Sequence, residues 1–165
     1  MICKRTAVYP GTFDPITLGH LDIIKRSSSI FDNLVIAIAE SNLKKTLFSL
    51  NERVEMVKKE VRMNDLCNVK VKSFNGLLVK FVKNEGINII VRGLRAIGDF
   101  EHEFQMSFIN KTLDHNIETI FLPATENVHF ISSTFVKEVT KLGVQEHKLV
   151  SPHVKKLLIE KLENA

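Results

Sequence analysis

The stretch Tyr9-Pro10-Gly11-Thr12-Phe13-Asp14-Pro15-Ile16-Thr17-Leu18-Gly19-His20 joins two different hydrophobic patterns. Before it, the apolar run from Ala7 to Tyr9 is typical of a buried strand. After it, Leu21, Ile24 and Phe31 recur at a spacing that places them on one face of a helix. The Pro-Gly and Asp-Pro pairs between the two patterns favour a turn. The stretch therefore predicts a strand, a loop and a helix, with polar groups at the carboxyl end of the strand.

The polar groups of this loop indicate a binding site for phosphate. In open α/β sheets ligands collect beyond the carboxyl ends of the strands, and the N-terminus of a helix favours an anion. Thr12, Thr17 and His20 supply hydrogen-bond donors, while Gly11 and Gly19 allow the backbone to approach a ligand closely. The alternative is that the prolines and glycines only form turns and that His20 only caps a helix, because glycine-rich turns alone are weak signals.

The rest of the chain alternates between strand and helix patterns. Further strands are expected at residues 34–39, 68–73, 88–91 and 118–122, and further helices after Ser49, after Gly76, around residues 100–108, from Phe135 and from Ser151. Ser49 and Glu52 form a capping-box pattern. In the helix from Phe135, the side chains of Phe135, Val139 and Leu142 are expected to face inward.

Strict alternation of this kind predicts the α/β class. The expected fold is a single-domain, Rossmann-like, doubly wound sheet of about five parallel strands with helices on both faces. That domain covers residues 1–165 and includes a C-terminal helix at about 151–163.

Length and composition are those of an ordinary globular protein. The chain has 165 residues, of which 44% are hydrophobic and 25% charged, enough for one domain with a substantial core. No apolar stretch approaches the roughly 18 residues needed to cross a bilayer, and no signal-peptide pattern is present. The two cysteines, Cys3 and Cys67, are isolated, as expected in a reducing compartment. These features predict a cytoplasmic location with no membrane partner.

The net charge of +4 raises the question of nucleic-acid binding. Basic residues are interleaved with acidic ones, as in Lys58-Lys59-Glu60, whereas nucleic-acid binders more often carry a concentrated basic stripe with stacking aromatics. Most of the eleven phenylalanines have spacings typical of a core. A nucleic-acid partner is therefore not expected. The alternative, a non-catalytic basic domain, predicts steeply salt-dependent binding to DNA or RNA.

Candidate anion-binding residues follow four of the predicted strands, although neither a Walker-A motif nor GxGxxG occurs. They are Thr12 and His20 after the first strand, Lys44 after the second, Arg92 and Arg95 after the fourth, and Ser132 to Thr134 after the fifth. A parallel sheet brings such strand ends to a single crevice. Any one of these basic residues alone is better read as a solvated surface residue. The six histidines lack HxxH and HExxH spacing, so no metal-binding residue is predicted.

Several of these segments resemble those of one enzyme family. Thr17-Leu18-Gly19-His20 resembles the T/H-x-G-H signature of the nucleotidyltransferase superfamily, and the whole stretch from Tyr9 to His20 is similar to bacterial phosphopantetheine adenylyltransferases. The other matching segments are Arg92 to Ala96, similar to I-R-G-L-R-A, Asp99 to Glu103, similar to D-F-E-Y-E, and Ile131 to Thr134, similar to I-S-S-S/T. The resemblance spans Ala7 to Val139, and the chain is identified as a member of this family.

The resemblance implies an activity. The family transfers the adenylyl group of ATP to 4'-phosphopantetheine, forming dephospho-CoA and pyrophosphate in coenzyme A biosynthesis. The transfer is in line, without a covalent enzyme intermediate, and Mg²⁺ is carried with ATP. The family is usually hexameric, and coenzyme A is a feedback ligand of many members. The rival within the superfamily acts on nicotinate mononucleotide or glycerol 3-phosphate. It shares the Gly-His and Ile-Ser-Ser elements, but residues 92–95 and 99–101 favour phosphopantetheine.

The resemblance also implies roles for individual residues. The catalytic group is His20, Lys44, Thr12 and Arg95, of which Thr12 and His20 would steady the developing negative charge. The acceptor site is Thr12, Lys44, Leu77, Leu78 and Arg92. The ATP site is Thr12, Phe13, His20, Gly93, Leu94, Arg95, Glu103, Val128, His129, Phe130, Ile131, Ser132, Ser133 and Thr134. From the residues alone, the two leucines are better read as helix core and Glu103 as a solvated acid.

Three departures from the family pattern are present. His102 stands where the family commonly has Tyr, residues 41–46 lack the usual prolines, and Val128-His129 replaces Trp-Ser. None removes a charge that the transfer needs. The departures are therefore expected to change affinity rather than the type of reaction.

Overall fold

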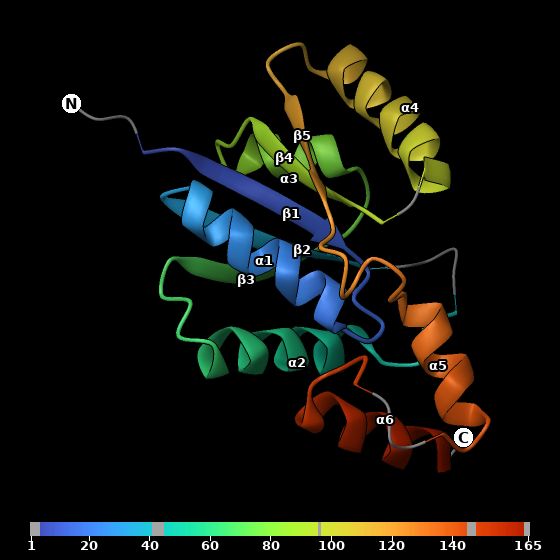
Figure 1. The fold of residues 1–165 in the computed structure, drawn as a ribbon. Coiled ribbons are helices and arrows are strands. Elements are labelled where there is room, and N and C mark those ends of the chain that lie inside the picture. Colours follow the sequence, from blue (N-terminus) through green and yellow to red (C-terminus); the bar gives the residue numbers. More distant parts are fainter. Residues whose placement is uncertain (1–3, 41–44, 96, 145–147, 164–165) are drawn as a thin grey trace.

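The computed structural model describes residues 4–40, 45–95, 97–144 and 148–163 (Figure 1). In chain order the elements are β1 (Thr6–Gly11), α1 (Leu18–Ile30), β2 (Asn33–Ala39), α2 (Leu50–Met63), β3 (Val69–Phe74), α3 (Leu78–Asn84), β4 (Ile89–Leu94), α4 (Ile97–Leu113), β5 (Glu118–Pro123), α5 (Ser133–Lys141) and α6 (Pro152–Glu163). Strands and helices alternate up to β5, as the hydrophobic patterns predict.

The five strands form one parallel sheet in the order β3-β2-β1-β4-β5. The chain runs from β1 outward to β3, then returns to the other side of β1 and continues through β4 to β5. The direction of winding therefore reverses between β1 and β4. In sheets of this type the crevice at that reversal is where ligands bind. The predicted α/β class and the five-stranded parallel sheet are confirmed.

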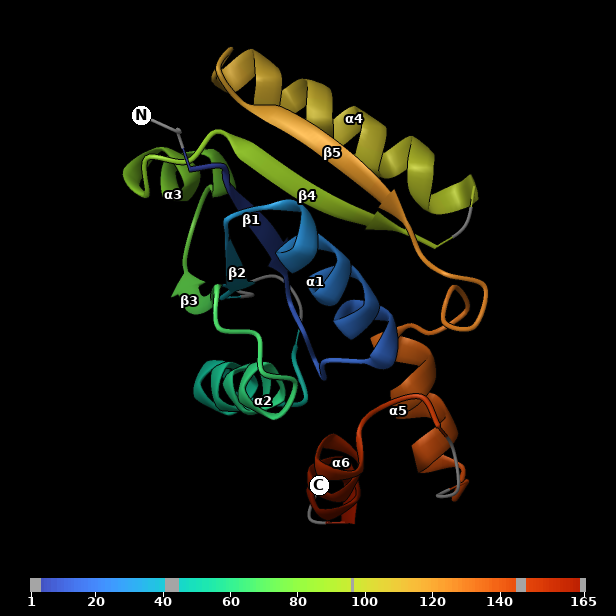
Figure 2. The same ribbon diagram turned by 60° about the vertical axis from the view of Figure 1, so that its left-hand side comes forward.

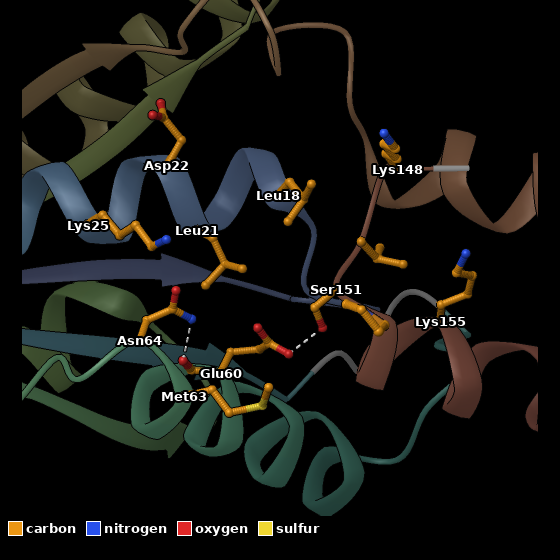
Figure 3. Close-up of a pocket in the computed structure, with 12 residues that line it drawn as sticks. Leu18, Leu21, Asp22, Lys25, Glu60, Met63, Asn64, Lys148, Ser151 and Lys155 are labelled. Carbon is orange, nitrogen blue, oxygen red and sulfur yellow. Dashed lines mark hydrogen bonds between the residues drawn. The ribbon is translucent and has the colours of Figure 1, made fainter. Parts of the chain in front are cut away.

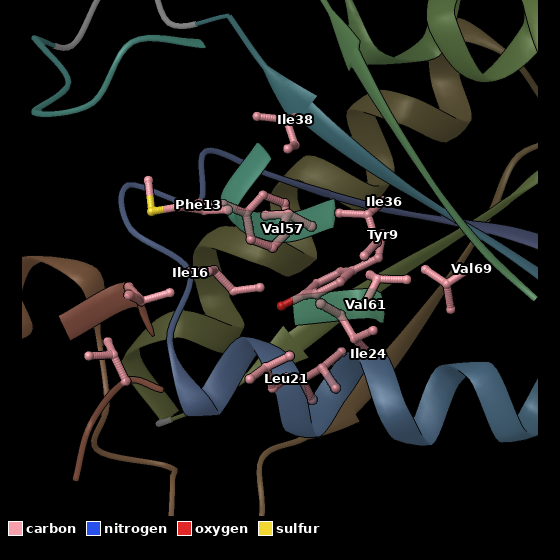
Figure 4. Close-up of a cluster of buried hydrophobic side chains, with 14 of the residues drawn as sticks. Tyr9, Phe13, Ile16, Leu21, Ile24, Ile36, Ile38, Val57, Val61 and Val69 are labelled. Carbon is pink, nitrogen blue, oxygen red and sulfur yellow. The ribbon is translucent and has the colours of Figure 1, made fainter. Parts of the chain in front are cut away.

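Helices cover both faces of the sheet, because alternate residues of each strand point to opposite faces. On one face Tyr9 and Ile36 pack against Ile24 of α1 and Val57 of α2 (Figure 4). On the other face Val8 belongs to a second buried cluster that includes residues of α3. The α4 helix lies along β4 and β5 (Figure 2). The predicted coverage of both faces is confirmed.

The start of α2 shows how local sequence determines a helix end. The Ser49 hydroxyl accepts a hydrogen bond from the Glu52 amide at 3.3 Å, and the Glu52 carboxylate accepts one from the Ser49 amide at 2.7 Å. The predicted capping box is therefore confirmed, with two backbone donors of the first turn satisfied. Among the helices of the described residues, none combines the length and apolar character that a bilayer-spanning helix requires.

The fourth strand is longer than the hydrophobic pattern predicts. The apolar run ends at Val91, but β4 continues through Leu94, and Arg92 pairs with Phe121 of β5. Parallel pairing uses backbone groups, so it continues past the point where the side chains stop being apolar. The expectation that Arg92 lies beyond the strand is therefore wrong: its backbone is part of the sheet.

The inward face of α5 also differs from the prediction. Phe135 and Leu142 are 43% and 82% exposed, whereas Val136 and Thr140 are buried. The expectation that Phe135 and Leu142 face inward is wrong, because α5 packs through the neighbouring stripe of residues spaced by four. The expectation that most phenylalanines are core residues is also too broad. The phenylalanines that are exposed are Phe100, Phe104, Phe108, Phe130 and Phe135.

Candidate active site

A cavity of about 650 Å³ lies at the carboxyl ends of β1, β2 and β4. It brings together most of the predicted site residues from four separate parts of the chain. Those that line it are Thr12, Phe13, His20, Leu78, Arg92, Gly93, Arg95, Glu103, Ile131, Ser132, Ser133 and Thr134. The crevice lies where the reversal of strand order predicts a ligand site.

Other predicted site residues lie elsewhere. Leu77, Leu94, Val128, His129 and Phe130 are not among the residues that line the cavity. Lys44 falls outside the described residues, and of its segment it is Lys45 and Thr46 that line the cavity.

The start of α1 explains why threonine and histidine occur three residues apart in this stretch. Thr17 is the N-cap, and its hydroxyl accepts a hydrogen bond from the His20 amide at 3.3 Å. In return, the Thr17 amide donates to Nδ1 of the His20 ring at 3.0 Å. His20 thus occupies the place that Glu or Gln takes in a common capping box. His20 therefore does both things that the sequence suggested: it helps to cap α1, and it lines the cavity.

The contacts of His20 determine its charge and tautomer. Burial, together with the positive charges of Arg95 and Arg92, lowers the pKa of His20 to about 4, and burial has the largest effect. The ring is therefore neutral at pH 7. Because Nδ1 accepts the Thr17 amide hydrogen, the single ring proton lies on Nε2. His20 thus offers a neutral N–H donor at the N-terminus of α1.

Arg92 is held in a fixed orientation. Its Nε and one terminal nitrogen donate to the two carboxylate oxygens of Glu103, both at 2.5 Å, and the other terminal nitrogen donates to the Pro10 carbonyl at 3.0 Å. This two-point pairing fixes the plane of the guanidinium group. The Glu103 side chain is only 14% exposed, so its reading as a solvated acid is wrong.

Arg95 has a more open setting than Arg92. Its guanidinium donates to both oxygens of Asp99, at 2.9 and 3.3 Å, and its side chain is 39% exposed. An ion pair this exposed contributes little to stability. Arg95 is therefore able to exchange Asp99 for another anion at modest cost.

The three hydroxyl residues at the start of α5 have different contacts. Ser132 is the N-cap, and its hydroxyl accepts a hydrogen bond from the Phe135 amide at 3.0 Å. The Ser133 hydroxyl donates to the Pro15 carbonyl at 2.7 Å, so its hydrogen is already engaged. Thr134 is exposed. The first-turn amides of this helix remain an anion-attracting end facing the cavity.

Gly93 allows two elements of the site to approach closely. A Cβ atom at this position would lie 3.0 Å from Cγ1 of Ile23, which is closer than side chains normally pack. The absence of a side chain on β4 therefore lets α1 lie directly against the strand. His20 belongs to the first turn of that helix, so the close approach also places the ring beside the end of β4.

Two buried charged residues of the site were not singled out from the sequence. Asp14 is 5% exposed and Arg53 is 2% exposed, and both connect the first loop to the segment before α2. Charged residues are rarely this buried, so composition gives no signal for them. A weak signal exists for Arg53, since it lies four residues before Val57 on the apolar side of the helix pattern.

A second cavity, of about 620 Å³, lies between α1, α2 and the segment that leads into α6 (Figure 3). Leu18 and Leu21 form part of its wall, and the Ser151 hydroxyl donates to the buried carboxylate of Glu60 there. None of the predicted site residues lines it. The two cavities are therefore separate, and the predicted chemistry belongs to the first.

The carboxylates of the first cavity do not form a preformed metal centre. Asp14 pairs with Lys137, Asp99 with Arg95, and Glu103 with Arg92. Within residues 4–40, 45–95, 97–144 and 148–163, no three His, Cys, Asp or Glu side chains come together in a way that could hold a metal ion. The described residues therefore do not fit a Mg²⁺ ion held by protein ligands alone.

Comparison with known proteins places this site in a family. The profile of the cytidylyltransferase-like family matches residues 8–139. A phosphopantetheine adenylyltransferase of Moorella thermoacetica is 53% identical over 157 residues, covering 95% of this chain and 97% of the relative. One from Wolbachia sp. subsp. Brugia malayi is 52% identical over 158 residues, covering 96% of this chain and 94% of the relative.

A solved structure shares the fold at lower identity. A Vibrio parahaemolyticus protein, provisionally described as a nicotinate-nucleotide adenylyltransferase, superposes with a TM-score of 0.73 at 20% identity, covering 97% of this chain and 95% of that one. Similarity at this level shows the shared fold only. The relatives at about half identity extend over nearly the whole chain, including every segment that lines the first cavity. The chain therefore belongs to the phosphopantetheine adenylyltransferases, within the cytidylyltransferase-like family.

Proposed function

We propose that this chain transfers the adenylyl group of ATP to 4'-phosphopantetheine, forming dephospho-CoA and pyrophosphate. As a member of its family the chain is a nucleotidyltransferase. The observation that carries the proposal is the neutral His20 ring, held by Thr17 at a helix N-terminus in the same cavity as Arg92 and Arg95. A neutral donor in the same cavity as two arginines suits a reaction between two phosphate groups.

The reaction needs positioning and charge neutralisation rather than a protein nucleophile. A phosphate oxygen of the acceptor attacks the α-phosphorus of ATP, forming a new P–O bond. The bond from that phosphorus to the bridging oxygen breaks, and pyrophosphate leaves with the electron pair. We assign Thr12 and the Nε2–H of His20 to the negative charge that develops on the α-phosphate. A neutral ring can donate this hydrogen bond without transferring a proton.

The cations divide between the two substrates. We assign Arg92 to the acceptor phosphate, Arg95 to the β- and γ-phosphates, and Lys44 to the acceptor phosphate and the transition state. The open pairing of Arg95 with Asp99 supports its role, because a partly exposed ion pair is readily exchanged for one with phosphate. Leu77 and Leu78 would line the pantetheine arm, and Leu78 does line the cavity.

The nucleotide site combines strand, helix and loop residues. We assign to it Phe13, Gly93, Leu94, Glu103, the segment from Val128 to Ile131, and the α5 N-terminus with Ser132, Ser133 and Thr134. The amides of the first turn of α5 support this assignment, since they attract phosphate oxygens. Because the carboxylates of the cavity are all ion-paired, we propose that Mg²⁺ enters bound to ATP, as part of the substrate.

We further propose that residues 1–165 form one domain and that the protein assembles as a homohexamer in the cytoplasm. The exposed apolar side chains of α4 support self-association, because large exposed apolar patches mark interfaces. They are Phe100, Phe104, Met106, Phe108, Ile109 and Leu113. The free, exposed thiol of Cys67 supports a reducing compartment. Coenzyme A, which contains the product, is proposed as a feedback ligand.

A coupled pyrophosphate assay with ATP, Mg²⁺ and 4'-phosphopantetheine tests the proposed function. Nicotinate mononucleotide serves as the alternative acceptor, and His20→Ala as the site variant. We expect turnover with phosphopantetheine alone, reduced roughly 10²–10³-fold in the variant, the usual loss when one transition-state donor is removed. Turnover with nicotinate mononucleotide alone would overturn the acceptor, and folded protein without turnover on either would overturn the reaction.

A further inference from the structure

We propose that Asp14 is a positioning residue of the active site, which holds the segment before α2 and the helix α5 in place around Thr12 and His20. The assignment rests on the proposed function and adds a residue that does not itself need to touch either substrate. Asp14 belongs to the stretch that organises the fold, yet the transfer mechanism gives it no task.

The Asp14 carboxylate accepts hydrogen bonds from two distant parts of the chain. One oxygen accepts from the Phe48 amide at 2.9 Å, and the other accepts from the Leu47 amide at 3.0 Å and from Nζ of Lys137 at 2.8 Å. The Asp14 side chain is 7% exposed. A single buried carboxylate therefore joins the loop after β1 to the segment before α2 and to the second turn of α5.

Arg53 completes the connection from the opposite side of the same segment. Its Nε donates to the Phe48 carbonyl at 3.2 Å, and one terminal nitrogen donates to the carbonyls of Thr12 at 2.7 Å and Ala39 at 2.9 Å. Both backbone groups of Phe48 are thus bound by buried charged side chains. Burial lowers the pKa of Arg53, and the charges of Asp14 and Glu40 act in the opposite direction.

These contacts link the two halves of the proposed site. Lys45 and Thr46 line the cavity just before the segment that Asp14 binds, and Lys137 lines it from α5. A second bond, from the Ser133 hydroxyl to the Pro15 carbonyl at 2.7 Å, joins the same loop to the first residue of α5. Displacing Asp14 would therefore shift two parts of the site relative to Thr12: residues 45–48, which precede α2, and the N-terminal turns of α5.

Only an aspartate meets the requirements of this position. An asparagine amide has one acceptor oxygen, so it cannot serve both backbone amides and the Lys137 ammonium group. A glutamate carries the same charge on a chain one methylene longer, which would push the bound segment outward. Misplacing reacting groups by about 1 Å can lower the rate of a positioned reaction about 10²-fold. Positioning therefore predicts a loss of kcat, while a purely structural role predicts a loss of stability alone.

The test compares kcat and KM for both substrates in Asp14→Asn, Lys137→Met and Lys137→Arg, measured well below each melting temperature. Lys58→Met is the matched control, since it removes the exposed ion pair between Lys58 and Glu55. We expect kcat to fall about 10²-fold in Asp14→Asn and about tenfold in Lys137→Met. Lys137→Arg should restore most of the loss, and the control should remain within twofold of the wild type.

Folded Asp14→Asn with kcat within twofold of the wild type would overturn the proposal. If Asp14→Asn does not fold, Lys137→Met decides: unchanged kcat overturns the proposal, and a tenfold loss rescued by Lys137→Arg supports it. Hydrogen exchange at the Leu47 and Phe48 amides tests the contacts without any activity. Faster exchange in Lys137→Met supports the linkage and wild-type exchange opposes it. An inactive wild type refutes the proposed function instead.

Discussion

Both carboxylate oxygens of Glu103 accept hydrogen bonds from the guanidinium group of Arg92, at 2.5 Å each. The pair joins the fourth strand to α4, and both residues line the cavity. It also joins two residues for which the family resemblance predicts different substrates, the acceptor for Arg92 and ATP for Glu103. In this arrangement Glu103 determines where the Arg92 charge lies.

We therefore expect Glu103→Gln to raise KM for 4'-phosphopantetheine about tenfold. The substitution removes the charge that holds the guanidinium group, and a loss of about 1.4 kcal/mol in binding corresponds to that factor. Steady-state kinetics with each substrate varied in turn provides the measurement. The neighbouring exposed Glu101→Gln is the control. A rise in KM for ATP alone would mean that Glu103 serves the nucleotide directly and not through Arg92.

The pH dependence of stability should report the state of His20. Its pKa is about 4 in the fold and about 6.5 when unfolded, so the unfolded chain takes up the proton more readily. The free energy of unfolding therefore keeps its full value above pH 6.5. It falls as the pH is lowered through 4, by about 3 kcal/mol in total. Chemical denaturation across this range measures it. In His20→Gln the free energy of unfolding should fall less steeply, and identical slopes would contradict the shift.

Ser132→Ala should affect both stability and nucleotide binding. The substitution removes the N-cap of α5, which typically costs about 1 kcal/mol, and it loosens the helix end that faces the cavity. We expect a lower melting temperature and a higher KM for ATP, with KM for phosphopantetheine unchanged. Thr134→Ala is the comparison, because Thr134 is exposed and is not the cap. Equal effects of the two variants would exclude capping as the cause.

The close packing at Gly93 gives a prediction about two residues together. A Cβ at position 93 would lie 3.0 Å from Cγ1 of Ile23, so Gly93→Ala should destabilise the protein and displace α1. In an Ile23→Ala background that clash is removed. The two substitutions should therefore be non-additive in a double-mutant cycle by denaturation. Additive effects would mean that the strain lies elsewhere.

The exposed face of α4 predicts the outcome of a charge substitution. Phe108 is 58% exposed, and Phe108→Lys places a charge within the apolar patch proposed as an interface. We expect a species of lower mass by sedimentation equilibrium. Met63→Lys, at a 59% exposed apolar residue of α2, controls for the added charge. An unchanged mass for Phe108→Lys would remove this face from the assembly.

The sequence predicts the order of elements well and their faces less well. Apolar runs locate strands because the strands of a parallel sheet are buried on both sides. They do not show that β4 extends through Arg92, since backbone pairing with β5 decides the strand end. In α5 two apolar stripes lie side by side, and periodicity alone cannot tell that Val136, not Phe135, faces the core.

Sequence reasoning finds some residues of the site and misses others. Motif spacing at strand ends identifies Thr12, His20 and Arg92, because topology brings those ends together. The buried residues Asp14 and Arg53 are not identified in this way, because a charged side chain is expected at the surface unless its partners are known. Most of their partners are backbone groups, of Thr12, Ala39, Leu47 and Phe48, which carry no side-chain signal in the sequence. A side-chain partner of Asp14, Lys137, lies 123 positions away from it.

The central position of β1 has a consequence for the order in which the protein folds. The two neighbours of this strand in the sheet are β2, the next strand along the chain, and β4, which begins only at Ile89. The bond between Asp14 and Lys137 joins residues 123 positions apart. Because contacts between residues far apart in the sequence form slowly, we expect the link from the loop after β1 to α5 to form late in folding. Pulsed hydrogen exchange during refolding would measure that delay as protection of the β4 and α5 amides later than protection of the Leu47 and Phe48 amides, which bind Asp14 from 33 and 34 positions away.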